Sequence, residues 1–154
     1  MNRLTKCLCL AMILTIGLSS CGGGSEKANV PNNLSALSNK ERQYFTNGRT
    51  LYQTLCISCH MDSGEGLGKL IPPLKGSDYL LGDVPATARI VKYGMKGPMV
   101  VNEVEYNQPM PGNPRLTNLE IAEVLTYISN NWGNEHGPVT IAEVAESLKE
   151  KGGN

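Results

Sequence analysis

The chain is organised around Cys56-Ile57-Ser58-Cys59-His60, a stretch with the pattern Cys-x-x-Cys-His. Two thiols three residues apart on one helical turn face the same way, and the imidazole of the next residue lies beside them. This pattern is the attachment signal for a covalent haem, in which the thiols form thioethers and the histidine reaches the iron. A redox dithiol and a zinc half-site are the alternatives that the motif alone leaves open.

Residues 1–20 have the features of a secretory signal. A basic start with Arg3 and Lys6 precedes an apolar run over residues 8–18, which is too short for a helix that spans a membrane. The closing residues Leu18-Ser19-Ser20-Cys21 resemble the lipobox of bacterial lipoproteins. We therefore expect cleavage before Cys21 and lipidation of that cysteine, with an ordinary cleavage site as the alternative.

Residues 21–37 are rich in Gly, Asn and Ser and show no apolar periodicity, which predicts a flexible tether. The remaining residues, 38–154, are enough for one small domain. The chain has 14 basic and 14 acidic residues, and loss of Arg3 and Lys6 with the signal leaves the mature protein slightly acidic. Because no basic run is present to neutralise phosphates, the sequence predicts no nucleic-acid partner.

The use of cysteine favours the haem interpretation of the central motif. Two cysteines leave with the signal and Cys21 takes the lipid, so Cys56 and Cys59 are the thiols that remain. A closed zinc site needs four ligands, and the two histidines, His60 and His136, lie far apart in the sequence. A redox dithiol of the thioredoxin kind would need a strand-helix-strand context, which the sequence does not show.

Helix starts are marked by side chains that cap the first turn. The capping-box pattern Ser/Thr-x-x-Glu occurs at residues 38–41, 117–120 and 140–143. Apolar residues at helical spacing follow each box, and Asp83 and Gly94 frame one more helix. Gly48 lies inside the first helical pattern, where glycine is unfavourable, so we expect either a close backbone neighbour or simple tolerance there.

The stretch before the helix at 117 is less regular. Valines and a tyrosine at residues 100–106 predict a small hairpin around Asn102-Glu103, although glycine is preferred at the position of Glu103. Residues 107–114 contain three prolines, and we expect no regular structure there. The sequence therefore predicts a small, loop-linked helical domain.

Taken together, these features resemble a class I c-type cytochrome over about residues 38–133. The order is the same: a first helix, Cys-x-x-Cys-His, a glycine-rich loop, a proline before a leucine, an isolated Met-Pro, and a last helix that ends in Tyr127 and Trp132. The resemblance implies an all-α fold of three to five short helices around one covalent haem c, with the first and last helices crossing at Gly48. It covers the hairpin and the helix at 140 less surely.

The resemblance also implies the surroundings of the iron. His60 is the expected first axial ligand, and Pro72, or alternatively Pro73, is expected to accept a hydrogen bond from its ring through the backbone carbonyl. Met110, which lies between two prolines, is the expected second ligand. The alternatives for that position are Met99, Met95 and His136.

A haem with both axial positions filled has no place for a small-molecule substrate, so we expect an electron carrier and not an enzyme. Its expected partners are redox proteins: a quinol-oxidising complex or dehydrogenase as donor, and a terminal oxidase or reductase as acceptor. It would be either a shuttle or a fixed subunit, exported to the periplasmic face and anchored by lipid. Gly22, in place of aspartate, favours the outer membrane. The alternative function is a haem enzyme or gas sensor with an open or labile sixth position.

Overall fold

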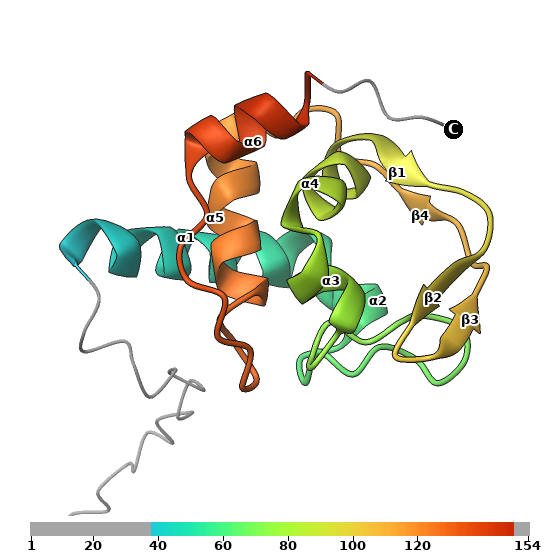
Figure 1. Ribbon diagram of the computed structural model, residues 1–154. Coiled ribbons are helices and arrows are strands. Elements are labelled where there is room, and N and C mark those ends of the chain that lie inside the picture. The colour runs from blue at the N-terminus through green and yellow to red at the C-terminus, as the bar shows by residue number, and fades with distance from the viewer. Residues whose placement is uncertain (1–37, 150–154) are drawn as a thin grey trace, which may run out of the picture.

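The computed structural model of the chain describes residues 38–149. The expected signal at 1–20, the tether at 21–37 and the lipidated Cys21 lie outside the described residues. Within 38–149 the chain forms helices and four short strands (Figure 1). The helices are α1 (Asn39–Leu55), α2 (Ile57–His60), α3 (Asp78–Gly82), α4 (Val84–Tyr93), α5 (Asn118–Ile128) and α6 (Ile141–Ser147). None of these helices is both long and apolar enough to cross a membrane.

The three capping boxes form as expected. At the start of α1, the Ser38 hydroxyl accepts from the backbone N–H of Glu41, and the Glu41 carboxylate accepts from the N–H of Ser38. The same reciprocal pair opens α5 at Thr117 and α6 at Thr140. Each box satisfies two N–H groups that have no partner inside the helix, which explains why these helices begin where they do.

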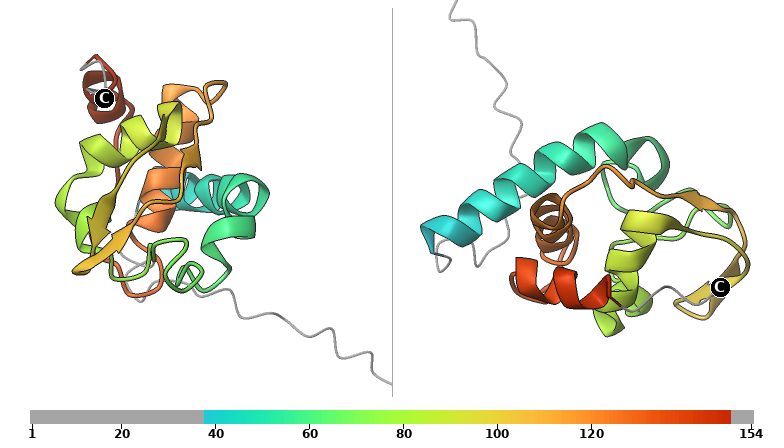
Figure 2. Two further views of the ribbon diagram at one scale, coloured as in Figure 1. Left: turned by 90° about the vertical axis from the view of Figure 1, so that its right-hand side faces the viewer. Right: turned by 90° about the horizontal axis from the view of Figure 1, so that it is seen from above.

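Helices α1 and α5 cross and pack directly against each other (Figure 2). A side chain at Gly48 would overlap the carbonyl oxygen of Glu123 and would lie 2.9 Å from the Cβ of Tyr127. The close backbone approach predicted for Gly48 is therefore confirmed. Tyr127 also packs its ring against those of Phe45 and Tyr52, with centroids 5.0 and 5.3 Å apart, so that aromatic contacts surround the crossing point.

The strands form two small antiparallel pairs, one beside α3 and the other beside α4. The predicted hairpin is confirmed as β2 (Met99–Val101) and β3 (Val104–Tyr106). Its two turn residues, Asn102 and Glu103, have φ of 50° and 65°, the left-handed conformation that a two-residue hairpin turn requires. The hairpin thus forms without the preferred glycine.

The second strand pair corrects the expectation of no regular structure at 107–114. There β4 (Met110–Pro111) pairs with β1 (Gly94–Met95), placing Gly94 opposite Pro111 and Met95 opposite Met110. Strands of two residues have no periodicity that a sequence could show. Proline is compatible with such a short edge pair because its missing N–H need not face the partner strand. The strands are small, and the described residues form the expected all-α class of short helices with a small hairpin.

We predict that Gly48→Ala severely destabilises the domain, by about 3 kcal/mol or more, because the new methyl group would meet backbone that cannot move aside. Denaturant unfolding of the purified protein measures this. Gly82→Ala is the matched control, since a Cβ there meets nothing within 4 Å. Equal stability of the two variants would show that the crossing is not as tight as described.

Candidate functional site

The Cys-x-x-Cys-His motif forms a single helical turn at the end of α1. The backbone N–H groups of Cys59 and His60 both donate to the carbonyl oxygen of Cys56, at 3.1 and 3.0 Å. The thiols of Cys56 and Cys59 are both free. Burial, with a smaller effect of Cys59, raises the pKa of the Cys56 thiol to about 11. The turn therefore presents two thiols and an imidazole together.

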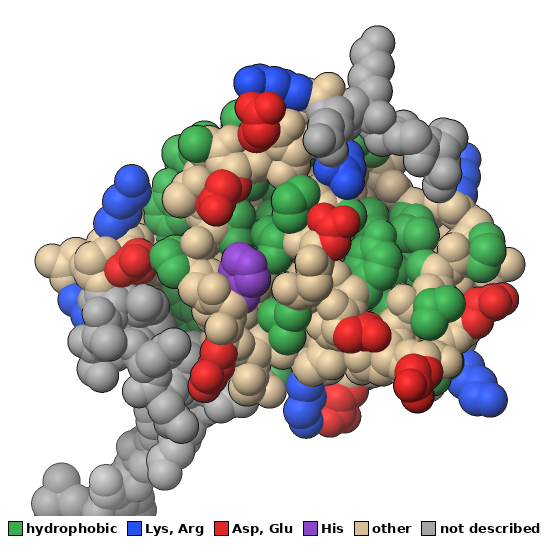
Figure 3. Space-filling model, viewed as in Figure 1, with side chains coloured by type: hydrophobic (Ala, Val, Ile, Leu, Met, Phe, Trp, Pro, Cys, Tyr) green, Lys and Arg blue, Asp and Glu red, His purple; other side chains and the backbone are tan. Residues whose placement is uncertain are grey.

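These three groups line a pocket of about 990 Å³, a volume that includes the space at its open mouth. Its walls come from α2, the loop at 71–74, α3, α4, the strands β1, β2 and β4, and the inner face of α5. The described residues that line it include no Asp, Glu, Lys or Arg. Figure 3 shows apolar side chains gathered between α4 and the strands. An apolar pocket beside two thiols suits a flat, largely hydrophobic group held by covalent bonds.

His60 is buried and oriented. Its exposed fraction is 7%, and its Nδ1 lies 3.2 Å from the carbonyl oxygen of Pro72. This contact leaves Nε2 for a metal. Burial lowers the pKa of His60, and the Pro72 carbonyl opposes this effect only in part. The neutral imidazole that a metal requires is thus favoured.

The glycine-rich loop fixes the position of the Pro72 carbonyl. Gly66 has a φ of 67°, and a Cβ on it would lie 2.6 Å from the Pro72 oxygen. The loop closes against itself here, because the N–H of Gly66 also donates to the carbonyl oxygen of His60 at 3.2 Å. Only glycine can satisfy both the left-handed conformation and this close approach.

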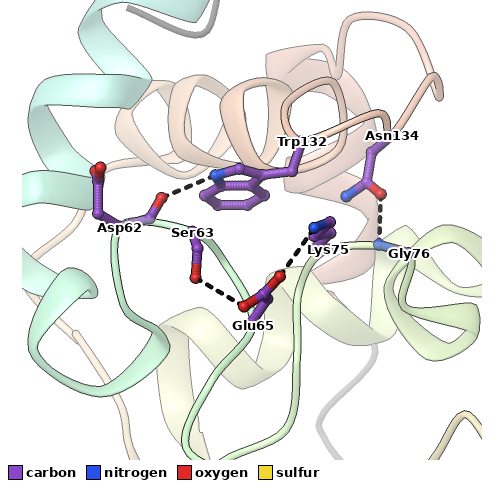
Figure 4. A network of polar contacts seen from close by, with 7 residues as sticks. All are labelled: Asp62, Ser63, Glu65, Lys75, Gly76, Trp132 and Asn134. Carbon is purple, nitrogen blue, oxygen red and sulfur yellow. Dashed lines mark hydrogen bonds and ion pairs between the residues drawn. The ribbon is translucent and has the colours of Figure 1, made fainter. Parts of the chain in front are cut away.

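Residues just after α5 hold the same loop from the other side (Figure 4). The indole N–H of Trp132 donates to the carbonyl oxygen of Asp62 at 2.9 Å, and the Asn134 amide accepts from the N–H of Gly76 at 2.8 Å. Asn134 also donates to the carbonyl oxygen of Leu74 at 2.9 Å. The sequence marked Trp132 only as the end of the last helix, and Asn134 carried no motif. A buried asparagine among loops has no sequence signature.

The same pocket is also lined by three methionines, namely Met95, Met99 and Met110. Met95 and Met110 are paired across β1 and β4, and directly opposed residues of an antiparallel pair project from the same face. The remaining alternative ligand, His136, is exposed and borders a separate small cavity beside α6. The structure therefore brings His60 and three thioethers, but not His136, to one pocket.

The chain after Met110 is anchored to the end of α4. A Cβ on Gly112 would lie 2.5 Å from the backbone nitrogen of Gly94, so the two segments pack backbone to backbone. The ammonium of Lys92 donates to the carbonyl oxygens of Pro114 and Leu116, at 2.8 and 2.6 Å. Neither glycine nor Lys92 was singled out by sequence for this role. Their roles appear only when α4 and the Met-Pro segment are side by side.

Comparisons with known proteins agree with this geometry. The cytochrome c family model matches residues 45–132. The cytochrome c subunit of an alcohol dehydrogenase (quinone) from Gluconobacter oxydans (strain 621H) is 31% identical over 107 residues, which cover 68% of this chain and 22% of that protein. Cytochrome c-552 of Thermus thermophilus is 32% identical over 83 residues, covering 51% of this chain and 63% of that protein.

A longer match extends over most of the chain. The cytochrome c subunit of the cytochrome bc1 complex of Corynebacterium efficiens is 24% identical over 152 residues, which cover 95% of this chain and 48% of that protein. The chain thus spans less than two thirds of the length of each of these relatives.

We predict that Gly66→Ala raises the reduction potential of the haem-loaded protein by on the order of 50 mV, equivalent to about 1 kcal/mol for one electron. The methyl group would displace the Pro72 carbonyl, weaken its hydrogen bond with His60 and make the imidazole a poorer donor to ferric iron. Redox titration measures the potential. Gly68→Ala is the matched control, because Gly68 also has a positive φ, of 53°, but open space around its Cβ position. A similar shift in both variants would assign the effect to backbone strain instead.

Proposed function

Because the chain belongs to the cytochrome c family, we propose that it carries electrons on the covalently bound haem c of that family and catalyses no reaction of its own. One observation carries this proposal: a single apolar pocket is lined by the attachment thiols, by His60 and by thioether donors. When bound, the haem supplies one-electron redox chemistry. The chain supplies attachment, axial donors and a wall without charged side chains.

We infer that His60 and Met110 are the axial pair. His60 has its Nδ1 3.2 Å from the Pro72 carbonyl, which supports Nε2 as the metal-binding nitrogen. Met110 is supported by its place in β4, because the backbone packing at Gly112 and the hydrogen bonds of Lys92 anchor the segment that follows it. A thioether ligand favours ferrous iron and raises the potential above that of a bis-histidine haem.

The proposed axial pair, His60 and Met110, would also exclude the binding of small molecules at the iron. With both axial positions filled from the chain, no coordination site is left for a small molecule. Cys59, one of the two thiols that would hold the haem, is exposed, so a redox partner would approach the group from that side. Fixed donors and a pocket of low polarity keep the structural change between oxidation states small, which favours fast electron transfer.

We propose that the protein works at the periplasmic face of a bacterial membrane, held there by lipid on Cys21 and the tether at 21–37. The lipobox-like residues before Cys21 support this anchor. Redox proteins are the proposed partners. Two relatives support these partners, because they are named as the cytochrome c subunits of a quinone alcohol dehydrogenase and of the bc1 complex. A quinol-oxidising complex or a dehydrogenase would therefore be the donor, and a terminal oxidase or reductase the acceptor.

A shuttle and a fixed subunit differ in what accompanies the protein. Solubilisation of native membranes in mild detergent, followed by size separation with haem detection, distinguishes them. Haem eluting as a free monomer supports the shuttle, whereas co-elution with a dehydrogenase or oxidase supports the subunit.

We predict that Met110→Ala removes the methionine-to-iron charge-transfer band in the near-red spectrum of the ferric protein. Met99→Ala and Met95→Ala are the matched controls and should retain it, because their side chains line the same pocket without ligating. A band that survives in Met110→Ala and disappears in either control would reassign the ligand. A wild type that lacks the band and binds carbon monoxide readily in the ferrous state would instead indicate a gas sensor or haem enzyme.

We predict that Cys21→Ser releases the exported protein from the membrane fraction into the soluble periplasmic fraction, because serine cannot receive the lipid. Fractionation with haem staining measures the distribution, and Cys7→Ser, within the expected signal, is the control. Membrane association that persists in Cys21→Ser would contradict the lipid anchor.

A further inference from the structure

The three pocket methionines lie on one continuous excursion of the chain, residues 94–112, which we call the strap. The strap leaves α4 as β1, runs out to the hairpin β2–β3 and returns as β4 (Figure 1). Its base is interlocked with α4, since Gly94 and Gly112 pack backbone to backbone there. Its far end, the turn Asn102-Glu103, lies against α3.

A reciprocal pair of hydrogen bonds joins that far end to α3. The backbone N–H of Asp78 donates to Oδ1 of Asn102 at 3.0 Å, and the N–H of Asn102 donates to Oδ1 of Asp78 at 2.8 Å. The same carboxylate oxygen accepts from the N–H of Tyr79 at 2.7 Å, which orients it. Asp78 is the first residue of α3, where a backbone N–H has no partner inside the helix. Asn102 therefore completes α3 while Asp78 holds the turn.

The turn requires a left-handed backbone conformation at both Asn102 and Glu103, which strains the chain. Asparagine tolerates the left-handed conformation, but a glutamate at the position of Glu103 does so poorly. Beyond the turn, Val101 and Tyr106 are buried, with exposed fractions of 1% and 7%. The hairpin is thus fixed by apolar contact on its inner side and by the Asp78–Asn102 pair at its tip.

We propose that Asp78 and Asn102 are positioning residues that keep the strap closed, so that the sixth axial position of the haem stays filled. This inference rests on the proposed function, because the strap carries the proposed ligand Met110. Opening would start at the turn, since the other end is interlocked with α4. With the pair intact, the protein would be a closed electron carrier. With the pair broken, the sixth position of the haem would admit external ligands.

Two variants break the pair by different routes. Asp78→Ala removes the carboxylate acceptor, and Asn102→Gly removes the side-chain acceptor while keeping the left-handed turn that the hairpin needs. Asp78→Asn is the conservative control, because its amide keeps the Oδ1 acceptor. Glu105→Ala is the second control, an exposed residue of the same hairpin opposite Val100.

Two measurements on the ferric haem-loaded protein test the proposal: the rate of imidazole binding, and the hydrogen exchange of the backbone N–H groups in residues 99–106. We expect both to increase about tenfold in Asp78→Ala and Asn102→Gly, the factor that loss of about 1.4 kcal/mol produces. Asp78→Asn and Glu105→Ala should match the wild type. Imidazole binding to Met110→Ala shows the rate for an open position.

Rates in both broken variants that equal those of Glu105→Ala would overturn the proposal. Faster hydrogen exchange without faster imidazole binding would overturn it too, because the pair would then hold the hairpin without controlling the sixth position. Failure of the proposed ligand is seen separately. If Met110→Ala keeps its near-red band, the assignment of Met110 is wrong, whereas hydrogen exchange in the hairpin still reports on the Asp78–Asn102 pair.

Discussion

The crossing of α1 and α5 at Gly48 is the contact on which the rest of the structure depends. It fixes the end of α1, where the Tyr52 hydroxyl donates to the carbonyl oxygen of Met61 and so holds the turn that carries the thiols and His60. It also fixes α5, whose inner face lines the pocket. Trp132, shortly after the end of α5, holds the loop that carries the Pro72 carbonyl. One backbone contact thus places both the attachment motif and the groups that orient its histidine.

The two sides of the pocket are built differently. The histidine side is an interlocked set of backbone contacts, in which Gly66 packs against the Pro72 carbonyl and leaves no room for adjustment. The methionine side is a long strap with short strand pairs, held at its tip by side-chain hydrogen bonds of Asp78 and Asn102. If His60 and a strap methionine hold the haem as proposed, a rigid first ligand and a more adjustable second one would allow the reduction potential to be tuned on the strap without disturbing covalent attachment.

Much of the fold could be predicted because its signals are local. The capping boxes and the helical glycine at position 48 each occupy a few consecutive residues, and each appeared where expected. The β1–β4 pair and the Asp78–Asn102 contact join segments far apart in the chain and have no periodicity or motif of their own. For the same reason, sequence could not distinguish Gly66 from Gly68, although only Gly66 touches the Pro72 carbonyl. The choice among the methionines and the expectations for residues 1–37 stay predictions.

The burial of Cys56 has a consequence for the order of biosynthesis. With a pKa of about 11 in the folded chain, its thiol stays protonated at neutral pH and is a poor nucleophile. Cys56 is only partly buried and lines the pocket, so the effect acts on its reactivity and not on its access. Thioether formation is therefore favoured before the chain packs around this residue, while the thiol still has its ordinary pKa. A chain that packs early has the same pocket but a less reactive thiol in it.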